Sequence, residues 1–221
     1  MVGMLKPEEL LEVMKSRRSI REYMMKAVPE EHIRLILEAA RWAPSGANTQ
    51  PWEFIVVRDR VVKERIRSLL VEKYRKAKEL YPSFPWDAMP WLPDCKYLSD
   101  VPVIIAVVGD PRKKRVYPGR NDEIFCFSIA AAIMNMLLMA TALGLGTVWL
   151  THSLVPEEDL KRALNIPPEL RLMSLIPVGY PPKPIGSYYP SPWVRPGHER
   201  LDLDRMVHYD QYGNKAKVHS V

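Results

Sequence analysis

The sequence contains few of the residues from which disulfide-stabilised or metal-centred proteins are built. Its 221 residues include two cysteines, Cys95 and Cys126, which form no CxxC pair. None of the five histidines belongs to an HxxxH pair, the kind of spacing that a zinc site requires. We therefore predict neither structural disulfides nor a metal site. The low cysteine content favours a reducing, cytoplasmic location.

Several catalytic and polyanion-binding signatures are also missing. The chain has no GxSxG elbow and no Walker phosphate loop, so neither a hydrolase nor a kinase finds support. The net charge is +6 and the pI about 9.3, but the basic residues are dispersed and 112–115 is the only dense run. Nucleic-acid binders carry longer basic stripes or a recognisable module. We predict no nucleic-acid partner.

Charged residues are absent over a long stretch in the middle of the chain. No Lys, Arg, Asp or Glu occurs within 124–156, and the segment 124–143 is long enough to cross a bilayer. Ser128, Asn135 and Thr141 interrupt its apolar character, and no second segment of this kind occurs. We favour a helix buried on all sides, covered in part by a partner subunit, over a membrane span.

Hydrophobic periodicity and turn residues predict helices and strands within a single domain, 1–221. Helices are expected at 7–15, 29–42, 60–80, 124–143 and 156–164, and strands at 52–57, 101–108, 147–151 and 171–178. Residues 81–97 hold four prolines among five aromatic residues, which predicts a lid or a packed irregular loop. A C-terminal extension is expected over 181–221.

Two clusters have the composition of a binding site. Arg17, Arg18, Ser19 and Arg21 place three guanidinium groups and a hydroxyl within five residues, and these groups form charge-assisted bonds to phosphate. The segment 43–52, Ala-Pro-Ser-Gly-Ala-Asn-Thr-Gln-Pro-Trp, offers small residues for close approach of a ring and amides that can read a heterocycle edge. A solvated basic turn and an ordinary helix-to-strand loop remain the simpler alternatives.

A glycine-rich stretch at 144–149 imitates a dinucleotide fingerprint. Its third glycine is replaced by Trp149, and a helix precedes it while a strand follows. A Rossmann turn needs the reverse order. We predict the end of a helix that leads into a buried strand.

Taken together, four blocks resemble the FMN-dependent nitroreductase family. They are Arg-Arg-Ser-Ile-Arg at 17–21, the segment 44–52, the run from Asn135 to Trp149, and Arg-Leu-Asp-Leu at 200–203. The resemblance implies an α+β nitroreductase-like fold, in which helices flank a mostly antiparallel central sheet. It also implies an intertwined homodimer with its active sites at the interface.

The resemblance also implies roles for individual residues. Arg17, Arg18 and Ser19 would hold the FMN phosphate and ribityl chain, and Arg21 would lie near the pyrimidine end of the flavin. The loop from the other subunit would contribute Pro44, Ser45 and Gly46, with Asn48 and Gln50 nearby. Near flavin N5 would lie Leu150, Thr151 and His152, where Thr-His departs from the Gly-Gly or Glu-Gly of many relatives. Arg200 would close over the phosphate.

The implied chemistry belongs to the flavin. Hydride would pass from NADH or NADPH to flavin N5 and then to a small electron-poor acceptor such as a nitroaromatic, a quinone or a flavin. No protein nucleophile is needed, while Arg21 and Thr151 would tune the flavin. The alternatives are a reductive dehalogenase or a flavin-destructase-like enzyme of the same family, a non-catalytic FMN-binding homodimer, and a phosphate-binding regulatory module.

Overall fold

The computed structural model describes residues 6–113, 120–150, 156–188 and 200–215. The chain divides into two compact units, 1–189 and 190–221, and each is described by itself. The second unit begins at residue 190, nine residues after the predicted start of the extension at 181, because residues 181–189 belong to the first unit.

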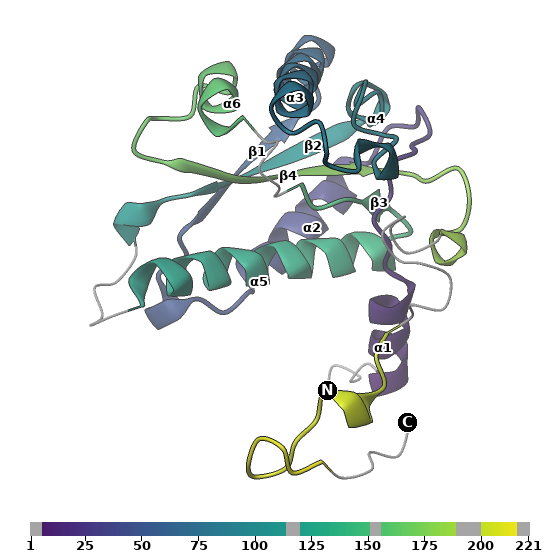
Figure 1. The fold of residues 1–221 in the computed structure, drawn as a ribbon, viewed down its shortest axis with the longest axis vertical. Helices are drawn as coiled ribbons and strands as arrows, with labels where there is room; N and C mark the ends of the chain where they lie inside the picture. Colours follow the sequence, from purple (N-terminus) through teal and green to yellow (C-terminus); the bar gives the residue numbers. More distant parts are fainter. Residues whose placement is uncertain (1–5, 114–119, 151–155, 189–199, 216–221) are drawn as a thin grey trace. The chain divides into compact units, whose positions relative to one another are not determined.

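One antiparallel sheet forms the centre of the first unit (Figure 1). Its strands are β1 (Trp52–Val57), β2 (Val103–Gly109), β3 (Gly146–Thr147) and β4 (Arg171–Gly179), in the order β1-β2-β4-β3. All three neighbouring pairs are antiparallel. At the β3 edge, Ser19 forms a parallel bridge with Thr147. The sheet thus continues into the predicted phosphate segment.

Helices cover both faces of this sheet. They are α2 (Glu30–Arg41), α3 (Arg60–Leu80), α4 (Tyr97–Asp100), α5 (Asn121–Ala142) and α6 (Glu157–Ala163), whereas α1 (Pro7–Ser16) contacts α5 and contributes to neither core cluster. Every residue of β2 is buried, and because strand side chains alternate, Ile104 and Ile105 enter different core clusters. The cluster containing Ile105 includes α2 and α5, while the other includes α3, α4, α6 and much of the lid segment 81–97. The predicted α+β fold is confirmed.

The predicted elements agree closely with the observed ones, with two corrections. The strand at 52–57 and the helix at 60–80 have the predicted bounds. The strand expected at 147–151 shrinks to Gly146–Thr147, followed by an isolated bridge between Leu150 and Leu175. Its register brings residue 148 opposite Pro177 of β4, and proline has no N–H with which to continue the ladder. The second correction is α4, a short helix that ends the lid segment.

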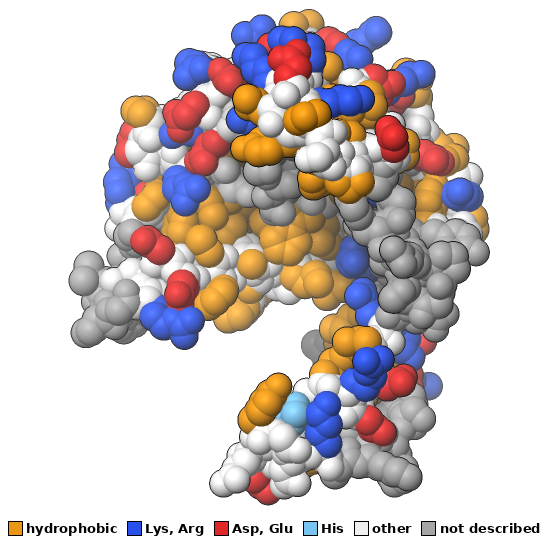
Figure 2. All heavy atoms as spheres, in the orientation of Figure 1, with side chains coloured by type: hydrophobic (Ala, Val, Ile, Leu, Met, Phe, Trp, Pro, Cys, Tyr) orange, Lys and Arg blue, Asp and Glu red, His pale blue; other side chains and the backbone are white. Residues whose placement is uncertain are grey.

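Helix α5 presents apolar side chains all around its axis. One side packs on the sheet and on α2, where the Asn135 amide donates to the Ala39 carbonyl at 3.0 Å. The other side exposes Phe127 (64%) and Met134 (41%), and hydrophobic side chains gather on this part of the surface (Figure 2). By length and composition α5 could cross a membrane, and 44% of its most apolar window is buried. The packing is that of a core helix with one uncovered face.

The second unit is described over 200–215. A single 3-10 turn, Leu203–Arg205, is its regular element there. The His208 and Tyr212 rings stack at 4.4 Å, and Lys215 Nζ donates to the Arg205 carbonyl at 2.8 Å. None of these described residues is buried. The prediction of one domain over the whole chain stays a prediction.

Candidate functional site

The segment from Arg17 to Arg21 lies along the edge strand β3. Ile20 N donates to the Thr147 carbonyl at 2.9 Å, and the Ile20 side chain is fully buried. A Cβ on Gly146 would lie 2.8 Å from the Ile20 side chain, so only glycine lets the two backbones approach this closely. Since side chains alternate along an extended segment, Ser19 and Arg21 project to the face opposite Ile20.

Arg21 is a partly buried cation that has no counterion among the described residues. Its guanidinium carbon lies 4.0 Å from the centroid of the Trp91 ring. Its Nε is buried and has no hydrogen-bond partner, and within the described residues no carboxylate lies within the 4.0 Å of an ion pair. Burial lowers the pKa of Arg21, while Tyr97 and Tyr23 act in the opposite direction. A desolvated, unsatisfied donor of this kind fits the polar edge of an anionic ligand.

Arg18 already has partners within the chain. Its Nε donates to the Tyr188 carbonyl at 3.1 Å, and its Nη1 donates to the Lys15 carbonyl at 2.6 Å and to the Arg17 carbonyl at 3.0 Å. These bonds join the end of α1 to the segment after β4. The roles predicted for Arg17, Arg18 and Ser19 at a phosphate stay predictions.

The loop predicted to reach a ligand has an unusual backbone. It contains the 3-10 turn Gly46–Asn48, and Ala47, Asn48 and Gln50 have φ angles of 51°, 55° and 44°. Non-glycine residues rarely adopt this left-handed region, and each costs on the order of 1 kcal/mol unless its surroundings enforce it. Ser45 Oγ accepts from Gln50 N at 3.0 Å, which closes the loop on itself.

Contacts with α5 fix this loop in place. Gly46 N donates to Ser128 Oγ at 3.2 Å, and a Cβ on Gly46 would lie 2.3 Å from Ile124 Cγ2. Glycine is therefore required here because Ile124 fills the space. Both contacts lie in the amino-terminal half of α5. Pro44, Ser45, Gly46, Asn48 and Gln50 thus form one continuous group.

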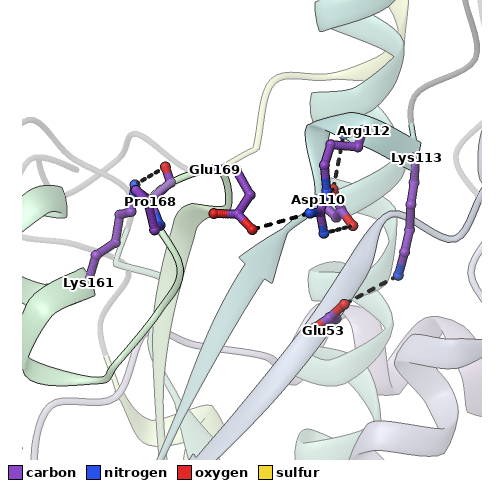
Figure 3. Close-up of polar contacts among 7 residues, drawn as sticks. All are labelled: Glu53, Asp110, Arg112, Lys113, Lys161, Pro168 and Glu169. Atoms are coloured by element: carbon purple, nitrogen blue, oxygen red, sulfur yellow. Dashed lines mark hydrogen bonds and ion pairs between the residues drawn. The ribbon is translucent and has the colours of Figure 1, made fainter.

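A charged network supports the far end of the same loop (Figure 3). The Pro51 carbonyl accepts from Asp110 N at 2.8 Å. The buried Asp110 carboxylate accepts from the Arg112 backbone at 3.0 Å and from its guanidinium at 2.8 and 3.0 Å. These hydrogen bonds lower the pKa of Asp110. Arg112 also pairs with Glu169 at 3.2 Å, so the start of the basic run serves internal structure.

Leu150, Thr151 and His152 form the third predicted group of site residues. Leu150, the first of them, forms the isolated bridge that follows β3. Leu150 is buried, and its N donates to the Leu175 carbonyl at 3.1 Å. Ser174 Oγ donates to the Leu150 carbonyl at 3.0 Å. Leu150 belongs to the core cluster that contains the lid residues. Thr151 and His152 lie outside the described residues, and Arg200 lies in the second unit, which is not placed relative to the first.

The structure separates the site residues of one chain into two groups. The arginine segment lies beside Gly146, just after the carboxyl end of α5, whereas Gly46 contacts Ile124 and Ser128 near its amino end. Figure 1 shows β3 at one end of α5. From Ser128 to Ala142 the helix axis alone advances about 21 Å at about 1.5 Å per residue. One chain therefore does not bring its two groups together.

Two features of the site were not predicted from sequence. The contact of Trp91 with Arg21 joins residues 70 positions apart, and the Asp110 network joins β2 to the segment before β4. The aromatic composition of 81–97 indicated a lid but not its contact. A cavity of about 520 Å³ near the carboxyl end of α5 holds none of the predicted site residues; its lining includes Ser16, Lys26, Thr141 and Lys183.

Comparisons with known proteins identify the family of the chain. A family model described as the nitroreductase family matches residues 14–180. A protein of Methanothermobacter thermautotrophicus named "Putative NADH dehydrogenase/NAD(P)H nitroreductase" is 36% identical over 183 residues, which is 81% of each chain. The iodotyrosine deiodinase of Thermotoga neapolitana is 30% identical over 186 residues, covering 81% of this chain and 92% of the relative.

Solved structures extend the comparison to the fold. Oxidized iodotyrosine deiodinase bound to FMN and 3-iodo-L-tyrosine aligns with a TM-score of 0.71 at 27% identity, covering 92% of this chain and 100% of the other. A Desulfovibrio desulfuricans protein described as "a putative nitroreductase in complex with FMN" aligns with a TM-score of 0.66 at 30% identity, covering 95% and 99%.

Fold and site together define an α+β domain with an unsatisfied cation at the edge of an antiparallel sheet. The chain belongs to the nitroreductase family. This membership confirms the resemblance drawn from the four sequence blocks. It also confirms the class of the protein as an FMN-dependent oxidoreductase.

Proposed function

We propose that the chain transfers hydride from NADH or NADPH to a small electron-poor acceptor, with FMN bound at the β3 edge. The observation that carries this proposal is Arg21, a partly buried cation whose Nε has no hydrogen-bond partner in the described part of the chain. When bound, FMN supplies a ring that accepts and donates hydride at N5. Arg21 supplies a fixed positive charge for the pyrimidine end, where negative charge develops on reduction.

The remaining predicted residues divide the work of holding FMN. Arg17, Arg18 and Ser19 bind the phosphate and ribityl chain, and Arg200 from the second unit closes over the phosphate. Leu150, Thr151 and His152 lie beside N5. The hydrogen bonds that join Leu150 to Leu175 and Ser174 support a fixed backbone position for Leu150 in this proposal.

A second copy of the chain completes each site. The uncovered apolar face of α5 needs a partner, and a two-fold axis across α5 would pair the helices in antiparallel fashion. The partner's loop, Pro44 to Gln50, would then approach this chain's arginine segment. The separation of the two groups within one chain supports this homodimer. Free Cys95 and Cys126 support a reducing cytoplasmic location.

The lid favours a flat acceptor. The described lid side chains around Arg21 are aromatic, Trp91 at 4.0 Å and the buried Tyr97, and these apolar surroundings suit a flat nitroaromatic, quinone or flavin better than a strongly hydrated acceptor. A second candidate is reductive dehalogenation, which the iodotyrosine deiodinase relatives favour. Exposed Asp94 and Lys96 of the lid could receive an amino-acid zwitterion, although the Asp94 carboxylate already accepts from Lys96 N at 2.9 Å.

Spectroscopy of the purified protein tests the proposal. The protein should be yellow, bleach with NADH or NADPH, and regain its colour when a quinone is added without air. Iodide release from 3-iodotyrosine under a chemical reductant would instead identify the dehalogenase. Colour that never returns in air would indicate flavin destruction. Bleaching by a chemical reductant but not by NADH or NADPH would indicate a binding protein. A colourless protein that takes up no FMN would overturn the proposal.

A further inference from the structure

The lid segment 81–97 meets the arginine segment through one side chain. Trp91 places its ring over Arg21, with 4.0 Å between the guanidinium carbon and the ring centroid. Trp91 is half-buried and packs against the lid-side core cluster. A guanidinium at this distance lies within the range of a cation–π contact, for which Trp is the strongest aromatic partner.

The chain on both sides of Trp91 is held by other contacts. Before it, Trp86 Nε1 donates to the Tyr81 carbonyl at 2.9 Å, and Trp86 meets Tyr74 of α3 edge-on at 5.4 Å. After it, Arg67 of α3 donates to the Asp94 carbonyl at 2.7 Å. These contacts do not involve the arginine segment, so the position of Trp91 is set independently of Arg21.

Few other contacts of the described residues orient the Arg21 guanidinium, so the contact with Trp91 matters for its position. Its Nε has no partner, and its Nη1 reaches the Ser19 carbonyl at 3.4 Å, near the limit of a hydrogen bond. Among the described residues, no acid compensates its charge. Burial lowers the pKa of Arg21, and the nearby Tyr97 and Tyr23 oppose this shift. The Trp91 face thus both orients the guanidinium plane and excludes water from one side of it.

We propose that Trp91 is a positioning residue for Arg21 and thereby raises the midpoint potential of bound FMN. The inference rests on the proposed function, because it needs FMN beside Arg21. A cation shielded from water acts more strongly on a nearby developing charge than a solvated one. Trp91 therefore couples the conformation of the lid to the redox properties of the cofactor, through Arg21 and not through contact with substrate.

A double-mutant cycle on the FMN-loaded protein tests this coupling. Trp91→Leu keeps an apolar side chain but removes the π face. We expect it to lower the affinity for reduced relative to oxidised FMN about fivefold, which for a two-electron couple is about 20 mV of midpoint potential. Trp91→Phe should restore most of the potential. In an Arg21→Ala background, Trp91→Leu should produce no further shift.

Phe84→Leu is the matched control on the same segment. Phe84 packs on Trp86 at 4.6 Å and not on Arg21, so its replacement should leave the potential unchanged. An unchanged potential in Trp91→Leu, or an equal shift when Arg21 is absent, would overturn the inference. Tighter FMN binding at an unchanged potential would also overturn it, because Trp91 would then merely compete with the ring. A wild-type protein that takes up no FMN would refute the proposed function, and this inference with it.

Discussion

The two predicted parts of the site, at opposite ends of α5, differ in how many of their polar groups are bonded within the chain. At the amino end, the loop from Pro44 to Gln50 closes through Ser45, packs on Ile124 and is supported by the Asp110 network. At the carboxyl end, Arg21 has a buried Nε that no described residue pairs with, beneath the Trp91 ring. The loop at the amino end is held by contacts within the chain. The arginine segment at the carboxyl end has a donor that is left for a ligand. A site that needs both requires two chains, and the following predictions test this relation.

The largest effect is expected from charging the uncovered face of α5. Phe127 and Met134 are seven residues apart and lie on one side of the helix. Phe127→Lys with Met134→Lys should give a monomer whose FMN affinity falls at least about a hundredfold, because each site loses the partner's loop and burying two charges costs several kcal/mol. Analytical sedimentation measures the oligomeric state, and the absorbance of bound FMN measures the affinity. Val61→Lys, at an exposed apolar position of α3 (78% exposed), is the control; an FMN-loaded monomer would refute the shared site.

A smaller loss should follow from reversing the charge of Arg200. Arg200→Glu removes a charge-assisted contact of about 1.5–3 kcal/mol and adds repulsion, so the FMN dissociation constant should rise at least about tenfold. Titration of apoprotein with FMN measures it. Arg205→Glu, in the same unit, should have little effect. Equal affinities for wild type and Arg200→Glu would remove the second unit from the cofactor site.

Filling Gly46 should displace the projecting loop without affecting the arginine segment. A Cβ there would lie 2.3 Å from Ile124, and overpacking of this kind costs about 1–3 kcal/mol. Gly46→Ala should therefore lower the thermal midpoint and weaken FMN binding about fivefold. Gly186→Ala, where a Cβ meets no atom within 4 Å, is the matched control. Unchanged FMN binding in Gly46→Ala would show that the loop does not reach a site.

The smallest effect on affinity is expected from Arg21, where the change should appear in the potential. Arg21→Ala removes a contact of about 1.5–3 kcal/mol that favours the reduced form, which lowers the midpoint potential by about 30–60 mV. FMN should remain largely bound. Arg17→Ala should weaken both redox forms equally, because the phosphate charge does not change. Loss of FMN from Arg21→Ala at an unchanged potential would make Arg21 another phosphate ligand.

Sequence was sufficient where local signals and tertiary packing agree. Helix α3 begins at its predicted residue because Asp59 caps it, accepting from Val62 N at 2.9 Å. Strand β3 was overestimated because the deciding residue, Pro177, lies on a strand 30 positions later. The Trp91–Arg21 contact could not be predicted from the sequence either, because the composition of a loop does not reveal which surface the loop covers. Pairing of segments distant in sequence is a tertiary property.

The left-handed residues of the loop also affect the thermodynamics of ligand capture. Ala47, Asn48 and Gln50 hold their strained φ angles through contacts that form when the chain folds. The conformational entropy of the loop is then lost during folding and not during binding. Association with a ligand should therefore show little of the heat-capacity and entropy change that accompanies ordering of a disordered segment. The penalty falls instead on the free energy of unfolding, so a variant with a relaxed loop would be more stable but would bind its ligand more weakly.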